Sequence, residues 1–358
     1  MTGNSNMAIA AKKHIAVWAI TPKGAKLAKK LTDKLPRTTL LLSTRTESDV
    51  EPDETFESLA DAVALIFDRF DAHIFIMSTG IVVRIIAPCL KHKTADPAVV
   101  VVDETARFAI SLTSGHLGGA NKLAHDVATA CGATPVITTA TDVNDLPAID
   151  LMAQTSGLEI ENPAAIKTVN MSILTGKRVA LFDPYGFVTA TGGKIKWKRL
   201  DAPTGFEKMT AEVYIDDVKT TLPDSTLVLR PPTLAVGIGC NRGTDVDEIE
   251  ALLVDVFEQN NLALNSIKTI GSIDLKKDEQ GLLALAKKYK LKLKFYTHQQ
   301  LDQVEGIKTP SAMVEKHTGA KSVCEAAALL AAGKSRLIVT KKKTPNVTVA
   351  VARADFTS

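Results

Sequence analysis

Residues 99–121, VVVVDETARFAISLTSGHLGGAN, contain the pattern that decides the fold of this chain. The four valines form a continuous apolar run, which is typical of a strand buried on both faces of a sheet. After a tight turn around Asp103 and Glu104, apolar and polar residues alternate over 106–111, which predicts a second strand and therefore a hairpin. The chain then passes through three glycines, a histidine and an asparagine into an apolar stripe with helical spacing. This order of elements is typical of α/β folds, in which ligands bind at strand ends.

The glycine-rich junction is the first candidate site. Gly115, Gly118 and Gly119 remove side chains where a ligand would meet the backbone, and free N–H groups at a helix start favour an anion. Ser114 is the predicted helix cap. The glycines match neither the G-x-G-x-x-G fingerprint nor a P-loop, so nucleotide binding has only weak support. The alternative is that the glycines only let the helix pack closely on the sheet, and the residues alone leave both interpretations open.

Strand and helix signals alternate along the first part of the chain. A buried strand pattern over 15–20 leads to Thr21 as a helix cap, with Pro22 at the first helical position. Repeated strand–helix units imply a mostly parallel sheet. The sequence therefore predicts an N-terminal α/β domain over residues 13–150, with at least one hairpin.

The composition changes after this domain. Prolines and glycines become frequent and strand signals become short, so we expect a small α+β middle region over 151–230. The run Arg230-Pro231-Pro232 predicts a linker, because consecutive prolines resist both helix and central strand. A strand–helix alternation then restarts and predicts a separate C-terminal α/β domain over 233–354. In that domain lysines alternate with apolar residues over 290–295, as is typical of a guarded edge strand.

Length and composition narrow the function classes. The chain has 358 residues, of which 45% are hydrophobic, enough for two or three domains with proper cores. A net charge of +3 permits an acidic ligand, and an aromatic content of 5% argues against stacking platforms for nucleic acid. We see no signal peptide and no membrane helix, and the four cysteines show no pairing pattern. We therefore expect a cytoplasmic protein with neither a nucleic-acid nor a membrane partner.

A second candidate anion site follows another predicted strand. Ser78, Thr79 and Gly80 offer backbone N–H groups, and the guanidinium of Arg84 comes one turn later, which suits a carboxylate. The alternative is a helix cap followed by a surface arginine.

Three titratable residues, His116, Asp103 and Glu104, lie in or near the predicted turns. His116 can serve as general base, as proton donor, or as axial ligand to a metal that a substrate brings. The alternative is a helix-start histidine bonded to the backbone. Asp103 and Glu104 can form a catalytic carboxylate pair or an ordinary hydrated turn. Because no H-E-x-x-H or Cys-x-x-Cys spacing occurs, we expect no metal bound by the protein itself.

Several motifs together make this sequence resemble one known family. In the first half they are Gly80-Ile-Val-Val-Arg84, Ile86-Ala87-Pro88, the segment from Lys93 to Glu104, the segment 114–121, and Thr138-Thr139-Ala140-Thr141-Asp142. In the last domain they are Val236 to Cys240 with Arg242-Gly243, Ile273-Asp274 with Lys276 and Glu279, Ser311, and Val323 to Ala328. The chain closely resembles the cobalt-precorrin-5A hydrolase family of anaerobic cobalamin (vitamin B12) biosynthesis. The resemblance is weak between about 155 and 230, and Cys324 stands where a small residue such as alanine is expected.

The resemblance implies an activity. It is hydrolysis of a δ-lactone on a contracted cobalt tetrapyrrole, after which the bridging carbon and its methyl group leave as acetaldehyde to give cobalt-precorrin-5B. No cofactor is implied, because the cobalt belongs to the substrate. Non-catalytic binding or carriage of a corrinoid intermediate is the main alternative. Transient contact with neighbouring pathway enzymes and homodimerisation stay open.

The site residues that we expect combine the motifs with this chemistry. His116 and Glu104 are the expected catalytic groups, with the roles of acid and base unassigned, and His116 should lie close to Glu104 and to the turn at Thr79. The expected substrate-binding residues are Ser78, Thr79, Gly80, Arg84, Asp103, Ser114, Gly115, Gly118, Gly119, Asn121, Gly239, Cys240, Arg242, Lys276, Glu279, Ser311 and Glu325.

Overall fold

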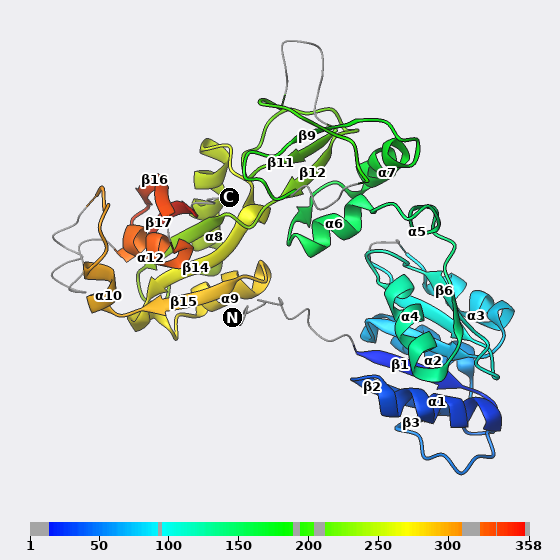
Figure 1. The fold of residues 1–358 in the computed structure, drawn as a ribbon. Coiled ribbons are helices and arrows are strands. Elements are labelled where there is room, and N and C mark those ends of the chain that lie inside the picture. Colours follow the sequence, from blue (N-terminus) through cyan, green and yellow to red (C-terminus); the bar gives the residue numbers. More distant parts are fainter. Residues whose placement is uncertain are drawn as a thin grey trace, which may run out of the picture. The chain divides into compact units, whose positions relative to one another are not determined.

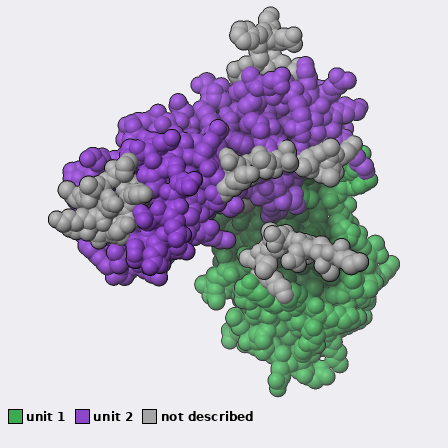
Figure 2. All heavy atoms as spheres, turned by 60° about the vertical axis from the view of Figure 1, so that its left-hand side comes forward, with its two compact units in different colours: residues 1–151 green, residues 152–358 purple. Residues whose placement is uncertain are grey.

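The computed structural model describes residues 14–91, 95–188, 194–203, 212–309, 323–333 and 335–354. The chain divides into two compact units, residues 1–151 and 152–358 (Figure 2). The first unit holds one sheet and the second holds two, and helices pack on these sheets (Figure 1). This architecture confirms the predicted multi-domain α/β class. The described residues contain no helix with the length and apolar character needed to span a bilayer.

The first unit is built around a seven-stranded sheet of order β3-β2-β1-β4-β5-β6-β7. Its strands are β1 (Ile15–Ala19), β2 (Thr38–Ser43), β3 (Glu54–Phe56), β4 (Ala72–Ile76), β5 (Ala98–Val102), β6 (Phe108–Thr113) and β7 (Thr134–Val136). Its helices are α1 (Pro22–Lys34), α2 (Leu59–Ile66), α3 (Thr79–Ile86), α4 (Ala120–Cys131), α5 (Ala140–Val143) and α6 (Ile149–Thr155), the last of which crosses the boundary between the units.

Both faces of this sheet are covered by helices. Strand residues alternate between faces, so Val17 packs with α1 and α4, whereas Trp18 packs with α2 and α3. Thr21 caps α1 as predicted, since its hydroxyl accepts a hydrogen bond from the Gly24 amide at 3.1 Å.

The direction of β6 decides where the glycine-rich junction lies. Strands β1 to β5 are mutually parallel, but β6 runs antiparallel to β5, which confirms the predicted hairpin. Thr113, the last residue of β6, pairs with Val99 near the start of β5. The residues after β6 therefore leave the sheet at the edge where the parallel strands begin, opposite to the edge where those strands end.

The second unit begins with a small five-stranded sheet of order β10-β9-β11-β12-β8. Its elements are β8 (Glu159–Ile160), α7 (Ile166–Leu174), β9 (Val179–Phe182), β10 (Trp197–Arg199), β11 (Val213–Ile215) and β12 (Leu227–Arg230). Pro231 and Pro232 separate this sheet from the next, although the side chain of Arg230 is buried.

The C-terminal sheet has the order β15-β14-β13-β17-β16. Its strands are β13 (Leu234–Cys240), β14 (Ile267–Ile273), β15 (Lys292–Tyr296), β16 (Ser335–Lys343) and β17 (Val347–Ala354). Its helices are α8 (Val246–Gln259), α9 (Gln280–Lys288), α10 (His298–Asp302) and α12 (Val323–Ala332). Strand β15 lies at the edge with its lysines exposed, which confirms the predicted guarded edge strand.

Helix α12 packs directly against two glycines of this sheet. A Cβ on Gly237 would lie 1.8 Å from the Cys324 carbonyl oxygen, and one on Gly271 would lie 2.6 Å from that of Ala327. Glycine in β13 and β14 is thus required for the helix to pack on the sheet.

A buried ion pair joins the two sheets of the second unit. Asp217 follows β11 of the small sheet, and Arg353 belongs to β17 of the C-terminal sheet. The guanidinium donates from Nε at 2.8 Å and from Nη2 at 2.5 Å to the two oxygens of the fully buried carboxylate, which also accepts from Thr233 Oγ1 at 2.5 Å. The two sheets are therefore coupled by a bidentate, charge-assisted contact.

Candidate active site

The junction between β6 and α4 is a tight turn that depends on glycine. Gly119 adopts a left-handed φ of 85° immediately before α4 and occupies the cap position. Ser114 also has a positive φ, 58°, and its carbonyl accepts a hydrogen bond from the Ala120 amide at 3.1 Å. The prediction of Ser114 as the helix cap is wrong, because the chain makes a further turn before the helix begins.

Gly118 is required by packing within this turn. A Cβ at this position would lie 2.3 Å from the Ser114 Cβ and 2.6 Å from the Ser114 carbonyl oxygen. Rotating a side chain cannot relieve a contact with backbone, so we expect Gly118→Ala to lower the free energy of unfolding by roughly 1–3 kcal/mol. Urea unfolding of the purified protein measures this change.

Gly80→Ala is the matched control for that substitution. Gly80 lies inside α3, and the nearest atom to an added Cβ is Ser78 Oγ at 3.9 Å. Alanine is the better helix former, so the free energy of unfolding of this variant should rise by about 0.5–1 kcal/mol. Equal effects of the two substitutions would contradict the packing role of Gly118.

The same turn presents backbone donors. Within the part of the chain that the structure describes, the N–H groups of Gly115, His116 and Leu117 donate to no protein acceptor. Successive unpaired N–H groups form a site that favours an anion. Close packing therefore accounts for Gly118, whereas ligand approach stays a prediction for the amides of Gly115, His116 and Leu117.

His116 is held between two carboxylates. Its Nε2 lies 2.9 Å from Asp142 Oδ2 and 3.0 Å from Thr141 Oγ1, and its Nδ1 lies 3.4 Å from Asp150 Oδ2. Asp142 comes from the short helix α5, and Asp150 comes from α6. The side chain of Asp142 is 38% exposed and that of Asp150 only 9%, so the Nε2 side of the ring is the side that a ligand can reach.

These carboxylates change the protonation of the ring. The hydrogen bond with Asp150 is the largest cause that raises the pKa of His116, burial opposes it, and the hydrogen bond with Asp142 adds to the rise. Burial pushes the pKa of Asp150 up, but the hydrogen bond and charge of His116 outweigh it, so this pKa lies below its usual range. Over the described residues, no group of three or more histidine, cysteine, aspartate and glutamate side chains is arranged to hold a metal ion.

Asn121 connects the turn to the acidic groups. Its Nδ2 donates to Thr139 Oγ1 at 3.0 Å and to Asp142 Oδ2 at 3.1 Å, and its Oδ1 accepts from Ser111 Oγ at 2.7 Å. This buried amide therefore positions Asp142, and through it the histidine, relative to the strand end.

Three buried oxygen atoms in this region lack a partner among the described residues. They are Thr113 Oγ1, Ser114 Oγ and Asp150 Oδ1. An unsatisfied buried polar group costs about 1–3 kcal/mol. Two of these atoms lie at the end of β6 and the third lies on α6, so a ligand or water there can complete their hydrogen bonds.

Glu104 lies at the opposite edge of the sheet. Its carboxylate accepts a hydrogen bond from Thr21 Oγ1, beside the start of α1. The edge where β5 begins and the edge where it ends are at least about 10 Å apart, because the paired segment from Val99 to Val102 lies between them and a strand rises about 3.4 Å per residue. The predicted approach of His116 to Glu104 and to the turn at Thr79 is therefore wrong, because β6 carries the chain back across the sheet.

Asp103 holds its own hairpin. Its two oxygens accept hydrogen bonds from the backbone amides of Thr105, Arg107 and Phe108 at 2.7–2.9 Å. Burial tends to raise the pKa of Asp103, but these bonds and that of the Thr105 hydroxyl lower it overall. The ordinary turn, one of the two interpretations that the sequence left open, accounts for both oxygens.

The second predicted anion site follows β4 at the same edge as Glu104. Ser78 precedes α3 and makes no capping hydrogen bond through its side chain, and Arg84 is exposed in the last turn of that helix. The roles predicted for Ser78, Thr79, Gly80 and Arg84 stay predictions, and they belong to a site separate from His116.

The residues predicted in the C-terminal domain form their own group at the ends of β13 and β14. Glu279 Oε1 accepts from the Gly243 amide at 2.8 Å, and Lys276 Nζ lies 3.4 Å from Glu279 Oε2. Arg242 pairs with Asp278 at 2.6 Å on the surface. These contacts join the loops after the two strands, next to Gly239 and Cys240.

Glu325 has a structural role in α12. Its fully buried carboxylate accepts hydrogen bonds from the amides of Lys308, Thr309 and Lys341 and from the Thr309 hydroxyl. Because protein donors occupy both oxygens, they are not available to a substrate, and the predicted binding role is not supported. Ser311 lies outside the described residues.

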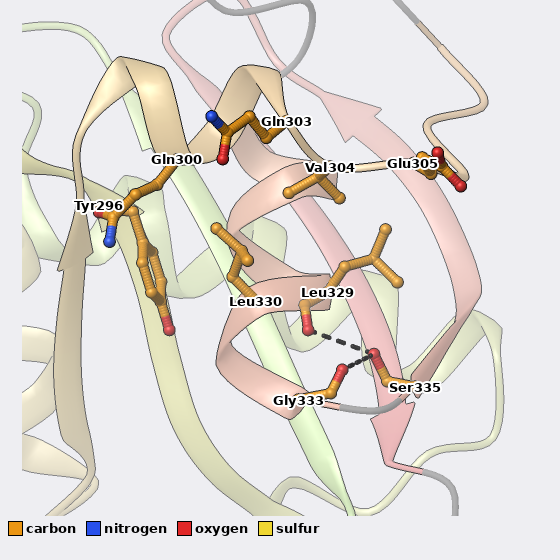
Figure 3. Close-up of a pocket in the computed structure, with 9 residues that line it drawn as sticks. All are labelled: Tyr296, Gln300, Gln303, Val304, Glu305, Leu329, Leu330, Gly333 and Ser335. Carbon is orange, nitrogen blue, oxygen red and sulfur yellow. Dashed lines mark hydrogen bonds between the residues drawn. The ribbon is translucent and has the colours of Figure 1, made fainter.

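A cavity of about 540 Å³ lies in the C-terminal domain between β15, α10 and α12 (Figure 3). The side chains of Tyr296, Leu329 and Leu330 line it, and Tyr296 Oη is one of the buried oxygens without a partner among the described residues. The lining residues that the structure describes include none of those predicted for the site, and Glu305 is their only carboxylate. The cavity is therefore a feature separate from the group around His116.

Comparison with known proteins covers nearly the whole chain. Three family models match it, described as cobalamin synthesis G N-terminal (residues 61–142), cobalamin biosynthesis central region (147–231) and cobalamin synthesis G C-terminus (234–352). Cobalt-precorrin-5A hydrolase of Priestia megaterium is 34% identical over 94% of this chain and 94% of its own length. The enzyme of that name from Salmonella typhimurium is 36% identical over 88% of this chain and 91% of its own length.

The comparison with solved structures found a cobalamin biosynthesis protein G homologue from Sulfolobus solfataricus. Its sequence is 22% identical and its TM-score is 0.34, and the match covers 96% of this chain and 97% of the homologue. The two curated relatives and the three family models are sufficient for the assignment. This chain belongs to the cobalt-precorrin-5A hydrolase family of cobalamin biosynthesis.

Proposed function

We propose that this protein hydrolyses cobalt-precorrin-5A: it opens the δ-lactone and releases acetaldehyde, a C–C bond cleavage, to give cobalt-precorrin-5B. A hydrolase role in cobalamin biosynthesis follows from its curated relatives. The observation that carries the proposed site is His116, held between Asp142 and Asp150 beside unpaired backbone N–H groups. These are the groups that ester opening requires: a proton acceptor, a proton donor and donors for a developing oxyanion.

The surroundings of His116 suit a large, partly apolar anion. The substrate is a flat macrocycle with acetate and propionate arms. Val143 of α5 is 68% exposed and Leu151 of α6 is 43% exposed, and each is one residue from a carboxylate that holds the histidine. Exposed apolar side chains beside a polar centre support binding of a ring face next to its lactone.

The reaction needs no resident cofactor in this proposal, because the substrate brings its own cobalt. Water attacks the lactone carbonyl, the acyl C–O bond breaks, and a carboxylic acid and an alcohol form. The alcohol then loses its proton, the C–C bond to the ring breaks as acetaldehyde forms, and the macrocycle takes up one proton. We place this reaction in the cytoplasm.

Acetaldehyde release separates this proposal from a non-catalytic corrinoid carrier. The purified protein is incubated under anaerobic conditions with cobalt-precorrin-5A, and acetaldehyde is measured against time. We expect one acetaldehyde per substrate consumed and many turnovers per protein molecule. A carrier would instead bind substrate stoichiometrically and release no acetaldehyde, and that result would refute the proposed function.

A further inference from the structure

We propose that His116 enters the reaction as an imidazolium and donates the protons, that Asp142 acts as the base, and that Asp150 is a positioning residue for His116. This inference rests on the proposed function and assigns roles within the same site. It begins from the geometry: each nitrogen of one ring faces a different carboxylate, at 2.9 Å for Asp142 and 3.4 Å for Asp150.

The ring in this position faces two carboxylate acceptors, one at each nitrogen. Neutral imidazole carries one N–H and one lone pair, so it satisfies only one of two carboxylates, whereas imidazolium donates to both. The charged groups bonded to the ring are Asp142 from α5 and Asp150 from α6, and Thr141 adds only a neutral hydroxyl. The doubly protonated ring is therefore the form that this environment stabilises, and it has no free lone pair for the substrate's cobalt.

The two carboxylates differ in access, and this difference assigns their roles. The side chain of Asp150 is 9% exposed, whereas that of Asp142 is 38% exposed and bonded to the outer nitrogen of the ring. Asp142 can therefore reach a bound water or the substrate alcohol. Asp150 touches the reacting atoms only through His116.

This arrangement also explains how one pair of groups serves two steps. In lactone opening, Asp142 takes a proton from the attacking water and His116 gives one to the departing oxygen. The proton on Asp142 then returns to His116 across their single 2.9 Å hydrogen bond. In acetaldehyde release, Asp142 takes the alcohol proton and His116 gives one to the macrocycle carbon that keeps the C–C electron pair. No net proton is gained or lost over the two steps.

The pH dependence of kcat tests these roles. If His116 is the donor, kcat must fall as pH rises through its pKa. In Asp150→Asn the carboxylate next to Nδ1 is lost, so the alkaline limb should move to lower pH by about one unit, with kcat nearly restored well below that limb. Asp142→Asn should lose kcat about 100-fold or more at every pH, since it lacks the base. Asp126→Asn, an exposed position on α4, is the matched control and should leave the profile unchanged.

A second measurement does not depend on turnover. Nuclear magnetic resonance of the free protein follows the His116 ring, whose signals are identified by their absence in His116→Gln. Its midpoint should coincide with the alkaline limb of kcat/KM in the wild type, because kcat/KM reports groups of the free enzyme, and it should fall in Asp150→Asn. A kcat/KM that rises with pH through the His116 midpoint, or an equal midpoint in both proteins, would overturn the inference. Absence of acetaldehyde release by the wild type would instead reject the proposed function. The resonance data do not depend on turnover, so they do not test that function.

Discussion

Replacing His116 with alanine is expected to lower kcat for acetaldehyde release by about 10²–10⁴-fold while KM changes little. The imidazole supplies its proton only as bonds break, so its loss removes stabilisation that is specific to the transition state. Steady-state kinetics with cobalt-precorrin-5A under anaerobic conditions, followed by acetaldehyde release, gives both parameters.

His125→Ala is the matched control for this substitution. His125 lies on the same helix that follows the glycine-rich turn, and its side chain is exposed. We expect wild-type kinetics for this variant. If His116→Ala raised KM by the same factor as it lowered kcat, the histidine would be a binding group or an axial ligand of the cobalt.

Replacing Asp217 with alanine is expected to destabilise the second unit by about 3–5 kcal/mol. The substitution removes the bidentate partner of Arg353 from a largely buried contact, because the Asp217 side chain is fully buried and that of Arg353 is 17% exposed. The loss should appear as a lower urea midpoint.

The two tryptophans allow this unit to be followed alone. Trp18 lies in the first unit and Trp197 in the second, so Trp197 fluorescence in a Trp18→Phe background reports the second unit. Asp278→Ala breaks the exposed pair with Arg242 and should leave the midpoint unchanged. A midpoint for Asp217→Ala equal to that of Asp278→Ala would contradict the coupling role of the buried pair.

Local signals predicted much of the fold correctly. The apolar run and the alternation after it gave the hairpin of β5 and β6, and Thr21 with Pro22 gave the start of α1, because these features depend on residues that are near in sequence. The helix start at Ser114 was wrong, since the chain makes a further turn through Gly118, which packs against Ser114, and through the left-handed Gly119.

The candidate site was predicted in part. His116, Asn121 and the glycines were found from the motif, but their pairing with Glu104 assumed that strand ends share one edge. That assumption holds for parallel strands only, and the predicted hairpin already implied that the chain had reversed. Glu104 and Asp103 therefore belong to the opposite edge.

Two functional carboxylates were not predicted. Asp142 ends the motif Thr138 to Asp142 that supports the family resemblance, which is the signal that marks it. Asp150 has no such signal, because its contact with His116 is set by how α6 packs after a loop. The buried role of Glu325 is likewise a product of packing between segments that are distant in sequence.

The most direct test of this account is a crystal structure of the inactive His116→Ala protein with cobalt-precorrin-5A bound. The account predicts that the lactone carbonyl lies within hydrogen-bond distance of Asp142 or of a water on it, beside the amides of Gly115 and Leu117. A lactone bound instead at the opposite sheet edge, against Thr79 and Glu104 and away from Asp142, would contradict it.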